Sequence, residues 1–226
     1  MTLRQHFTAT GDQSGTSSPM PRILGLTGGI GAGKSFVGHL LVQAGFPLFD
    51  SDAVARSAYT ESETVREQVT ALLGSECYDA EGLPRYSEIA RRVFATSTAG
   101  DALLHQLEQI IHPYVSERLV SWAREQQAPE GWLVLESAIL WQSGFDQYCD
   151  AVAVVTAPEA VRIARVQQRD RATREQVKAR MSRQQALDPT ALRQAYPDKP
   201  IYTICNDGTQ EPQLLIAELL RQLKQL

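Results

Sequence analysis

One loop constrains the fold of this chain more than any other feature: Gly28-Gly29-Ile30-Gly31-Ala32-Gly33-Lys34-Ser35. It matches G-x-x-x-x-G-K-[ST], the loop that wraps the phosphates of ATP or GTP. The apolar run at 23–26 predicts a buried strand before it, and residues 36–44 predict a helix after it, which Gly45 ends. A strand, a glycine loop and a helix in this order favour a nucleotide-binding α/β domain over a glycine-rich turn that binds nothing.

Each residue type in the loop has a use in holding a nucleoside triphosphate. The glycines let backbone N–H groups point at phosphate oxygens, and the helix N-terminus adds positive potential. We expect Lys34 to reach the β- and γ-phosphates and the hydroxyl of Ser35 to bind Mg²⁺. All eight loop residues are therefore predicted to bind the nucleotide.

Four further apolar runs predict, with the first, a five-stranded parallel sheet in an α/β fold. They lie at 46–49, 132–135, 151–155 and 201–205. Helical stretches separate them, which is typical of a sheet covered on both faces and binding its ligands at the carboxyl ends of the strands. After the run at 151–155, Thr156 and Glu159 have the spacing of a helix capping box.

The long segment between the second and third runs has no convincing strand. Helical patterns are found at 52–59, 64–73, 86–95 and 101–127. The last is interrupted by Pro113, which we expect to kink or restart the helix. So long a crossover predicts a helical insertion that covers the edge of the active site and binds the phosphoryl acceptor. A purely structural helical bundle is the alternative.

Acidic residues follow two of the predicted strands. Asp50 and Asp52 come directly after the second strand, where one carboxylate is expected to orient Mg²⁺ and the other to accept a proton from an acceptor hydroxyl. The alternative is that either caps the helix that follows. Glu136 ends the third strand and is a second candidate for the metal, with a surface glutamate as the alternative.

Seven arginines occur in one stretch of the chain: Arg162, Arg165, Arg169, Arg171, Arg174, Arg180 and Arg183. A second capping box at Thr173 and Gln176 predicts two helices separated by a turn near Asp170-Arg171-Ala172. Such a helix pair suits a phosphoryl-transfer lid, because guanidinium groups offset the charge of the transition state. A solvated basic face is the alternative.

Composition excludes several other classes. Lys and Arg number 22 against 26 Asp and Glu, a net charge of −4, which argues against a general nucleic-acid binder. No apolar run approaches the roughly 20 residues that span a bilayer. The three cysteines are far apart and predict free thiols in a reducing compartment, hence a cytoplasmic protein. The polar residues 1–20 predict a disordered tail.

Several segments, in order and over nearly the whole chain from Ile23, resemble the dephospho-coenzyme A kinase family. The phosphate loop is followed by Asp50-Ser51-Asp52-Ala53 and Arg56. Further matches are Gly82 to Arg85 with Val93-Phe94, Leu107-Glu108 with Ile111-His112-Pro113, the lid residues Arg165, Arg169-Asp170, Arg180 and Gln184, and Asn206-Asp207-Gly208. The family's proline and terminal glutamate are missing from the segment 136–142.

The resemblance implies a three-layer P-loop kinase core at 21–226, with an acceptor-binding insertion at 57–128 and a lid at 165–185. It implies ATP- and Mg²⁺-dependent phosphorylation of the ribose 3′-hydroxyl of dephospho-CoA, the last step of coenzyme A synthesis. The catalytic residues would be Asp52 as the base, Lys34, Arg165 and Arg169. Asp52, Arg56, Arg85 and His112 would bind the acceptor, and Asn206 the adenine of ATP. A monomer is favoured.

Two other functions are weighed against this one. Another P-loop kinase, acting on a nucleoside monophosphate or a similar alcohol, would share the loop and the lid and differ in the insertion. A non-catalytic nucleotide-binding module would have little use for both Asp52 and the arginines. The chain also lacks the N-K-x-D tetrapeptide of a guanine-specific switch.

Overall fold

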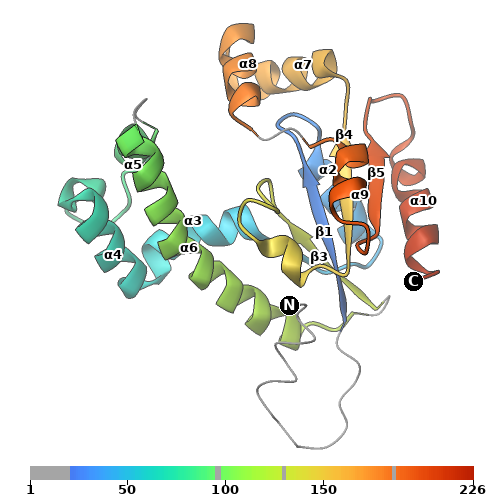
Figure 1. Ribbon diagram of the computed structural model, residues 1–226, viewed down its shortest axis with the longest axis horizontal. Helices are drawn as coiled ribbons and strands as arrows, with labels where there is room; N and C mark the ends of the chain where they lie inside the picture. The colour runs from blue at the N-terminus through green and yellow to red at the C-terminus, as the bar shows by residue number, and fades with distance from the viewer. Residues whose placement is uncertain (1–20, 95–97, 129–130, 185–186) are drawn as a thin grey trace, which may run out of the picture. The chain divides into compact units, whose positions relative to one another are not determined.

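The structure is a computed structural model that describes residues 21–94, 98–128, 131–184 and 187–226 (Figure 1). The predicted disordered tail at 1–20 and the last residue of the predicted lid lie outside the described residues. The contacts divide the chain into two compact units. Among the described residues, one comprises 21–49 together with those of Ala123–Leu226, and the other comprises those of Asp50–Trp122.

A parallel sheet forms the centre of the first unit. Its strands are β1 (Arg22–Gly28), β2 (Leu48–Asp50), β3 (Trp132–Glu136), β4 (Ala151–Thr156) and β5 (Ile201–Cys205), in the order β2-β3-β1-β4-β5. The prediction of five strands in an α/β fold is confirmed. Because β1 pairs in parallel with both β3 and β4, and β4 with β5, the carboxyl ends of these four strands meet at one edge.

The core of this unit lies between the sheet and two helices. The central strand places Leu24 and Leu26, both fully buried, against α2 (Lys34–Gln43) and α10 (Pro212–Leu223). On the other face of β1, a side chain at Gly25 would meet the sulfur of Cys149 at 2.8 Å and Leu140 at 2.9 Å. Burial on both faces explains why β1 is a nearly continuous apolar run.

Two helices after β4 form the predicted helix–turn–helix. They are α7 (Glu159–Asp170) and α8 (Arg174–Arg183), and Arg171 between them has a left-handed backbone with φ of 53°. The capping box of Thr173 and Gln176 is confirmed. The one predicted for Thr156 and Glu159 is wrong: Thr156 still belongs to β4, and Pro158 is the N-cap of α7. A short helix, α9 (Pro189–Ala195), precedes β5.

The second unit is helical in its described residues. Its helices are α3 (Ser51–Glu61), α4 (Glu63–Leu73), η1 (Ser75–Cys77), α5 (Tyr86–Val93) and α6 (Thr98–Glu125), whose end extends past the unit's boundary. Of the two outcomes predicted at Pro113, a restart of the helix is wrong, because α6 continues through this residue, and a kink stays a prediction. Proline removes one backbone donor from a helix of 28 residues, and the rest of the helix tolerates the loss.

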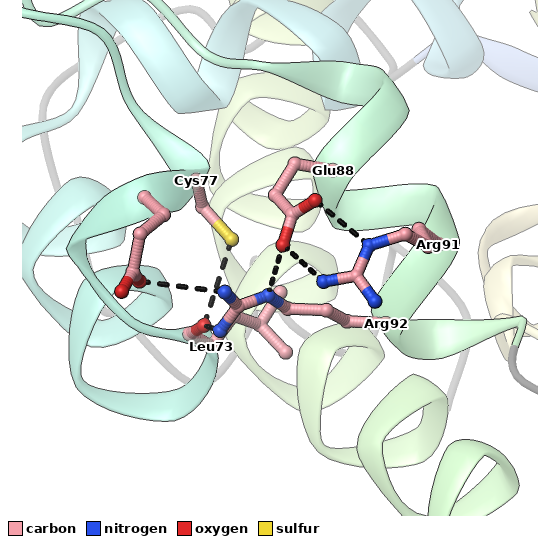
Figure 2. Close-up of polar contacts among 6 residues, drawn as sticks. Leu73, Cys77, Glu88, Arg91 and Arg92 are labelled. Carbon is pink, nitrogen blue, oxygen red and sulfur yellow. Dashed lines mark hydrogen bonds and ion pairs between the residues drawn. The ribbon is translucent and has the colours of Figure 1, made fainter.

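A polar cluster joins α4, η1 and α5 (Figure 2). Glu88 accepts hydrogen bonds from Arg91 and Arg92, which hold its pKa at about 2. Arg92 also donates to the carbonyl of Leu73, which in addition accepts a bond from the Cys77 thiol at 3.7 Å. Burial raises the pKa of that thiol. The cluster fixes the start of α5, where the amide of Arg85 donates to the carbonyl of Cys77 at 2.7 Å.

No helix in the described part of the chain combines the length and the apolar character that crossing a membrane requires.

Candidate active site

The glycine loop connects β1 to α2, and two of its glycines, Gly31 and Gly33, have a left-handed backbone that other residues rarely adopt. Gly33 has φ of +90°, and a Cβ there would lie 2.1 Å from the side-chain nitrogen of Asn206. At Gly29 a Cβ would lie 2.6 Å from a guanidinium nitrogen of Arg162. The loop is therefore enclosed by side chains from later parts of the chain. Glycine is required at Gly33, because of its positive φ, and at Gly31, which has φ of +77° and where a Cβ would lie 2.5 Å from the backbone oxygen of Arg162.

Lys34 and Ser35 converge on one carboxylate. The ammonium of Lys34 lies 2.6 Å from Oε1 of Glu136, and the Ser35 hydroxyl donates to the same oxygen at 2.7 Å. Glu136 is only 4% exposed, so the alternative of a surface glutamate is wrong. The last residue of β3 thus lies beside the first residues of α2. Together they offer an ammonium, a hydroxyl and a carboxylate, the groups that bind a triphosphate and its cation.

Asn206 and Arg165 enclose the loop from the β5 side. The Asn206 side chain donates to the carbonyl of Ala32 at 2.9 Å, and the Asn206 backbone amide donates to the carbonyl of Thr156 at 2.8 Å. Arg165 donates to the backbone carbonyl of Asn206 at 2.9 Å and to that of Ala32 at 3.3 Å. The two residues predicted to serve ATP and the transferred phosphoryl group are therefore in direct contact.

The other predicted lid arginines lie further along the helix pair. Arg169 and Arg180 each approach Asp170 at 2.7 Å, and both are more than half exposed. These two pairs join the end of α7 to α8. Hydrogen bonds from both guanidinium groups lower the pKa of the Asp170 carboxyl. Exposed ion pairs of this kind contribute little to stability.

Arg162 and Gln184 reach the loop but were not among the predicted site residues. Arg162 donates to the carbonyl of Ile30 at 2.9 Å, and the amide of Ile30 donates to the side-chain oxygen of Gln184 at 2.7 Å. Burial lowers the pKa of Arg162. Arg162 is one of the seven clustered arginines, and Gln184 is one of the residues that match the family. Neither signal predicts that the residue contacts the loop.

A cavity of about 770 Å³ lies beside these residues. Its lining includes Gly29 and Ala32 of the loop, Thr156 at the end of β4, and Arg162, Lys178 and Gln184 of the helix pair. The phosphate loop lies on one side of the cavity and the helix pair on the other, where Glu159 also lines it and its carboxylate lies 3.7 Å from the Lys178 ammonium. Arg162 therefore offers the cavity a positive charge, and the charge of Lys178 is offset by Glu159.

The remaining predicted residues belong to the second unit. Asp50 caps α3 by accepting the amide of Ala53 at 2.9 Å, so the capping alternative is confirmed for this residue. Asp52 lies in the first turn of α3 and Arg56 one turn later, where the Arg56 carbonyl accepts the hydroxyl of Tyr86 at 3.1 Å.

Two further residues of the second unit complete the predicted acceptor site. Arg85 is exposed at the start of α5, and His112 is half-buried on α6. Burial lowers the pKa of His112, and nearby His105 lowers it further, against an opposing effect of Glu108. Burial therefore favours the neutral imidazole at pH 7.

Comparisons with known proteins agree on one family. The sequence profile of the dephospho-CoA kinase family matches residues 22–198, more than half of the chain. The chain is 37% identical to a dephospho-CoA kinase of Porphyromonas gingivalis over 198 residues, which cover 88% of this chain and 91% of the relative. It is 32% identical to one of Corynebacterium diphtheriae, covering 90% and 96%.

Solved structures show the same fold. A crystal structure from Thermus thermophilus is 30% identical with a TM-score of 0.72, covering 91% of this chain and 98% of that one. A dephospho-CoA kinase from Campylobacter jejuni is 18% identical with a TM-score of 0.59, covering 90% and 97%, which supports the fold.

Proposed function

The chain belongs to the dephospho-CoA kinase family, and we propose how its own residues carry out the reaction of that family. The activity is ATP-dependent phosphorylation of dephospho-CoA in coenzyme A biosynthesis. One observation carries the assignment of roles: Lys34 and Ser35 of the phosphate loop meet Glu136, which ends the strand beside the loop.

ATP binds, in this proposal, along the carboxyl edge of the sheet in the first unit. The loop amides and Lys34 hold the phosphates, and Asn206 lies beside the adenine. Arg165 is already placed against the loop by its bonds to Ala32 and Asn206. We propose that α7 and α8 form the lid, with Arg169 leaving Asp170 to offset charge on the transferred phosphoryl group.

Mg²⁺ is the proposed cation of the site, and the donors present fit it. Mg²⁺ prefers oxygen ligands and keeps several waters, so a hydroxyl and one or two carboxylates suffice to hold it. The Ser35 hydroxyl and Glu136 lie within hydrogen-bond distance of each other, and Asp50 is the third candidate. When bound, the ion neutralises charge on the β- and γ-phosphates.

Glu136→Gln tests the metal assignment. We expect the Mg²⁺ concentration for half-maximal rate to rise about 10- to 100-fold, the usual effect of losing a residue that orients a metal ligand. The measurement is the initial rate of ADP formation against Mg²⁺ at saturating ATP. Glu211→Gln, at an exposed residue before α10, is the matched control. An unchanged Mg²⁺ dependence in Glu136→Gln would leave this residue with a structural role only.

The acceptor binds to the second unit in this proposal. Asp52 accepts the proton of the ribose 3′-hydroxyl, while Arg56, Arg85 and His112 bind the rest of dephospho-CoA. Both arginines are exposed, so an anionic substrate can reach them. Three exposed apolar side chains of this unit offer a surface to the acceptor's uncharged arm: Leu83, Tyr86 and Phe94.

A kinase for another small acceptor would share the loop, the lid arginines and Glu136. ATP consumption with dephospho-CoA, compared with AMP, CMP and shikimate, separates the two. We expect turnover above background with dephospho-CoA alone. Preferred turnover of any of the other three would contradict the proposed acceptor.

We further propose a cytoplasmic monomer. Cys77 and Cys149 are buried free thiols and Cys205 is an exposed one, which suits a reducing compartment. All residues assigned to the reaction come from one chain, so a second copy is not needed to complete the site.

A further inference from the structure

Ile30, in the middle of the phosphate loop, is bound by both helices that follow β4. Its carbonyl accepts the Nε–H of Arg162, from α7, at 2.9 Å. Its amide donates to the side-chain oxygen of Gln184, the C-cap of α8, at 2.7 Å. The backbone N–H and C=O of this one loop residue are therefore both hydrogen-bonded to side chains that are more than 130 positions away in the sequence.

The side chain of Ile30 adds an apolar contact to these two bonds. It packs against the small core of the helix pair, formed by Ile163, Val166 and Val177, each at most 2% exposed. This core is separate from the one that α2 and α10 make with the sheet. The helix pair therefore has an apolar core of its own, and one of the residues packed on it comes from the phosphate loop.

Gln184 also links this junction to the segment after β3. Its side-chain nitrogen lies 3.5 Å from the carbonyl of Ala138, two residues beyond Glu136. A glutamine can accept through its oxygen while it donates through its nitrogen, so one side chain orients two backbone groups. Methionine has nearly the same length but no comparable acceptor, and glutamate keeps the acceptor without the donor.

We propose that Gln184 is a positioning residue that couples the α7–α8 lid to the phosphate loop through Ile30. Since the end of α8 holds the Ile30 amide and α7 holds its carbonyl, the helix pair cannot shift at its base without displacing the loop. Phosphate binding, which fixes the loop amides, then also fixes the base of the lid. The affinity for ATP therefore depends on Gln184 through its bond to the Ile30 amide.

The test compares Gln184→Met and Gln184→Glu with the parent chain and with Gln168→Met, the same change at an exposed site on α7. The first readout is hydrogen exchange of the Ile30 amide, followed by NMR without ligand. The second is the dissociation constant of ATP with Mg²⁺, measured by calorimetry without acceptor. Far-ultraviolet circular dichroism shows that each variant is folded.

We expect Gln184→Met to speed exchange of the Ile30 amide at least about 3-fold and to weaken ATP binding by about 3- to 10-fold, as loss of one hydrogen bond allows. Gln184→Glu keeps exchange at the parent rate, because its carboxylate still accepts the Ile30 amide. Gln168→Met changes neither quantity. Parent-like exchange in Gln184→Met, or faster exchange with unchanged ATP affinity, overturns the proposal.

The inference rests on the proposed function only in taking ATP as the ligand of the loop. If the parent chain binds ATP but does not phosphorylate dephospho-CoA, the proposed acceptor is wrong. The coupling between Gln184 and the phosphate loop through Ile30 can still be tested by the same two measurements. The two failures are therefore distinguishable.

Discussion

Replacing Asp52 by Asn is expected to lower kcat by at least about 10²-fold, with the affinity for ATP nearly unchanged. A ribose hydroxyl is a poor nucleophile at neutral pH, so a carboxylate must accept its proton as the bond to phosphorus forms. General-base assistance contributes about 10²- to 10⁴-fold. Asn keeps the size and most of the hydrogen bonding of Asp but cannot take the proton. The measurement is steady-state ADP formation with dephospho-CoA, together with ATP binding.

Asp50→Asn is the matched control for Asp52→Asn. Asp50 caps α3, and Asn is as good an N-cap as Asp, so the helix should be retained. We expect a smaller loss of turnover, expressed mainly as a higher Mg²⁺ requirement. If Asp50→Asn were inactive and Asp52→Asn nearly as active as the parent, the two roles would be exchanged. If neither variant lost turnover, the base would lie elsewhere.

Lys34→Met should lower turnover by about 10²- to 10³-fold, the usual effect of removing one group that stabilises charge in a transition state. Methionine preserves the length of the side chain and removes only the ammonium. The measurement is kcat with dephospho-CoA at saturating ATP and Mg²⁺. Turnover within a few-fold of the parent would contradict the assignment of the phosphate loop.

Lys34 also has a structural partner, so stability must be measured beside turnover. The Lys34 and Glu136 side chains are 13% and 5% exposed, and removing one member of a buried pair costs about 3 kcal/mol. Lys34→Met should therefore have a lower urea midpoint than Lys34→Met/Glu136→Gln, in which both charges are removed. Both variants should be equally poor in turnover. Recovery of activity together with stability would show that the loss in Lys34→Met came from misfolding.

The fold was predictable because its signals are local. The strand–loop–helix around Gly28, the apolar runs of β3 and β4, and the capping box at Thr173 each depend on neighbouring residues. Predictions failed where contacts between distant parts of the chain override a local sequence pattern. Thr156 pairs with Cys205 in the sheet, so it cannot also cap α7. Pro113 removes one backbone donor, but α6 does not restart there.

The sequence predicts which residues belong to the candidate site better than it predicts which of them contact one another. The motif identifies Lys34 and Ser35, and the position at the end of a strand identifies Glu136. Their contact depends on β1 and β3 being neighbours, with Leu26 beside Glu136, which no local pattern specifies. The contact between Gln184 and Ile30 could not be predicted from local sequence, because the two residues are 154 positions apart. The roles assigned to Asp52, Arg56, Arg85 and His112 stay predictions.

The most direct test of the central claim is mass spectrometry of dephospho-CoA incubated with the parent chain, ATP and Mg²⁺. We expect a product heavier by one phosphoryl group, with the group on the ribose 3′-oxygen by NMR and with one ADP formed for each product. Asp52→Asn at the same concentration should give almost none of it. Unchanged dephospho-CoA in the presence of a folded, ATP-binding parent chain would show that the chain does not phosphorylate this acceptor.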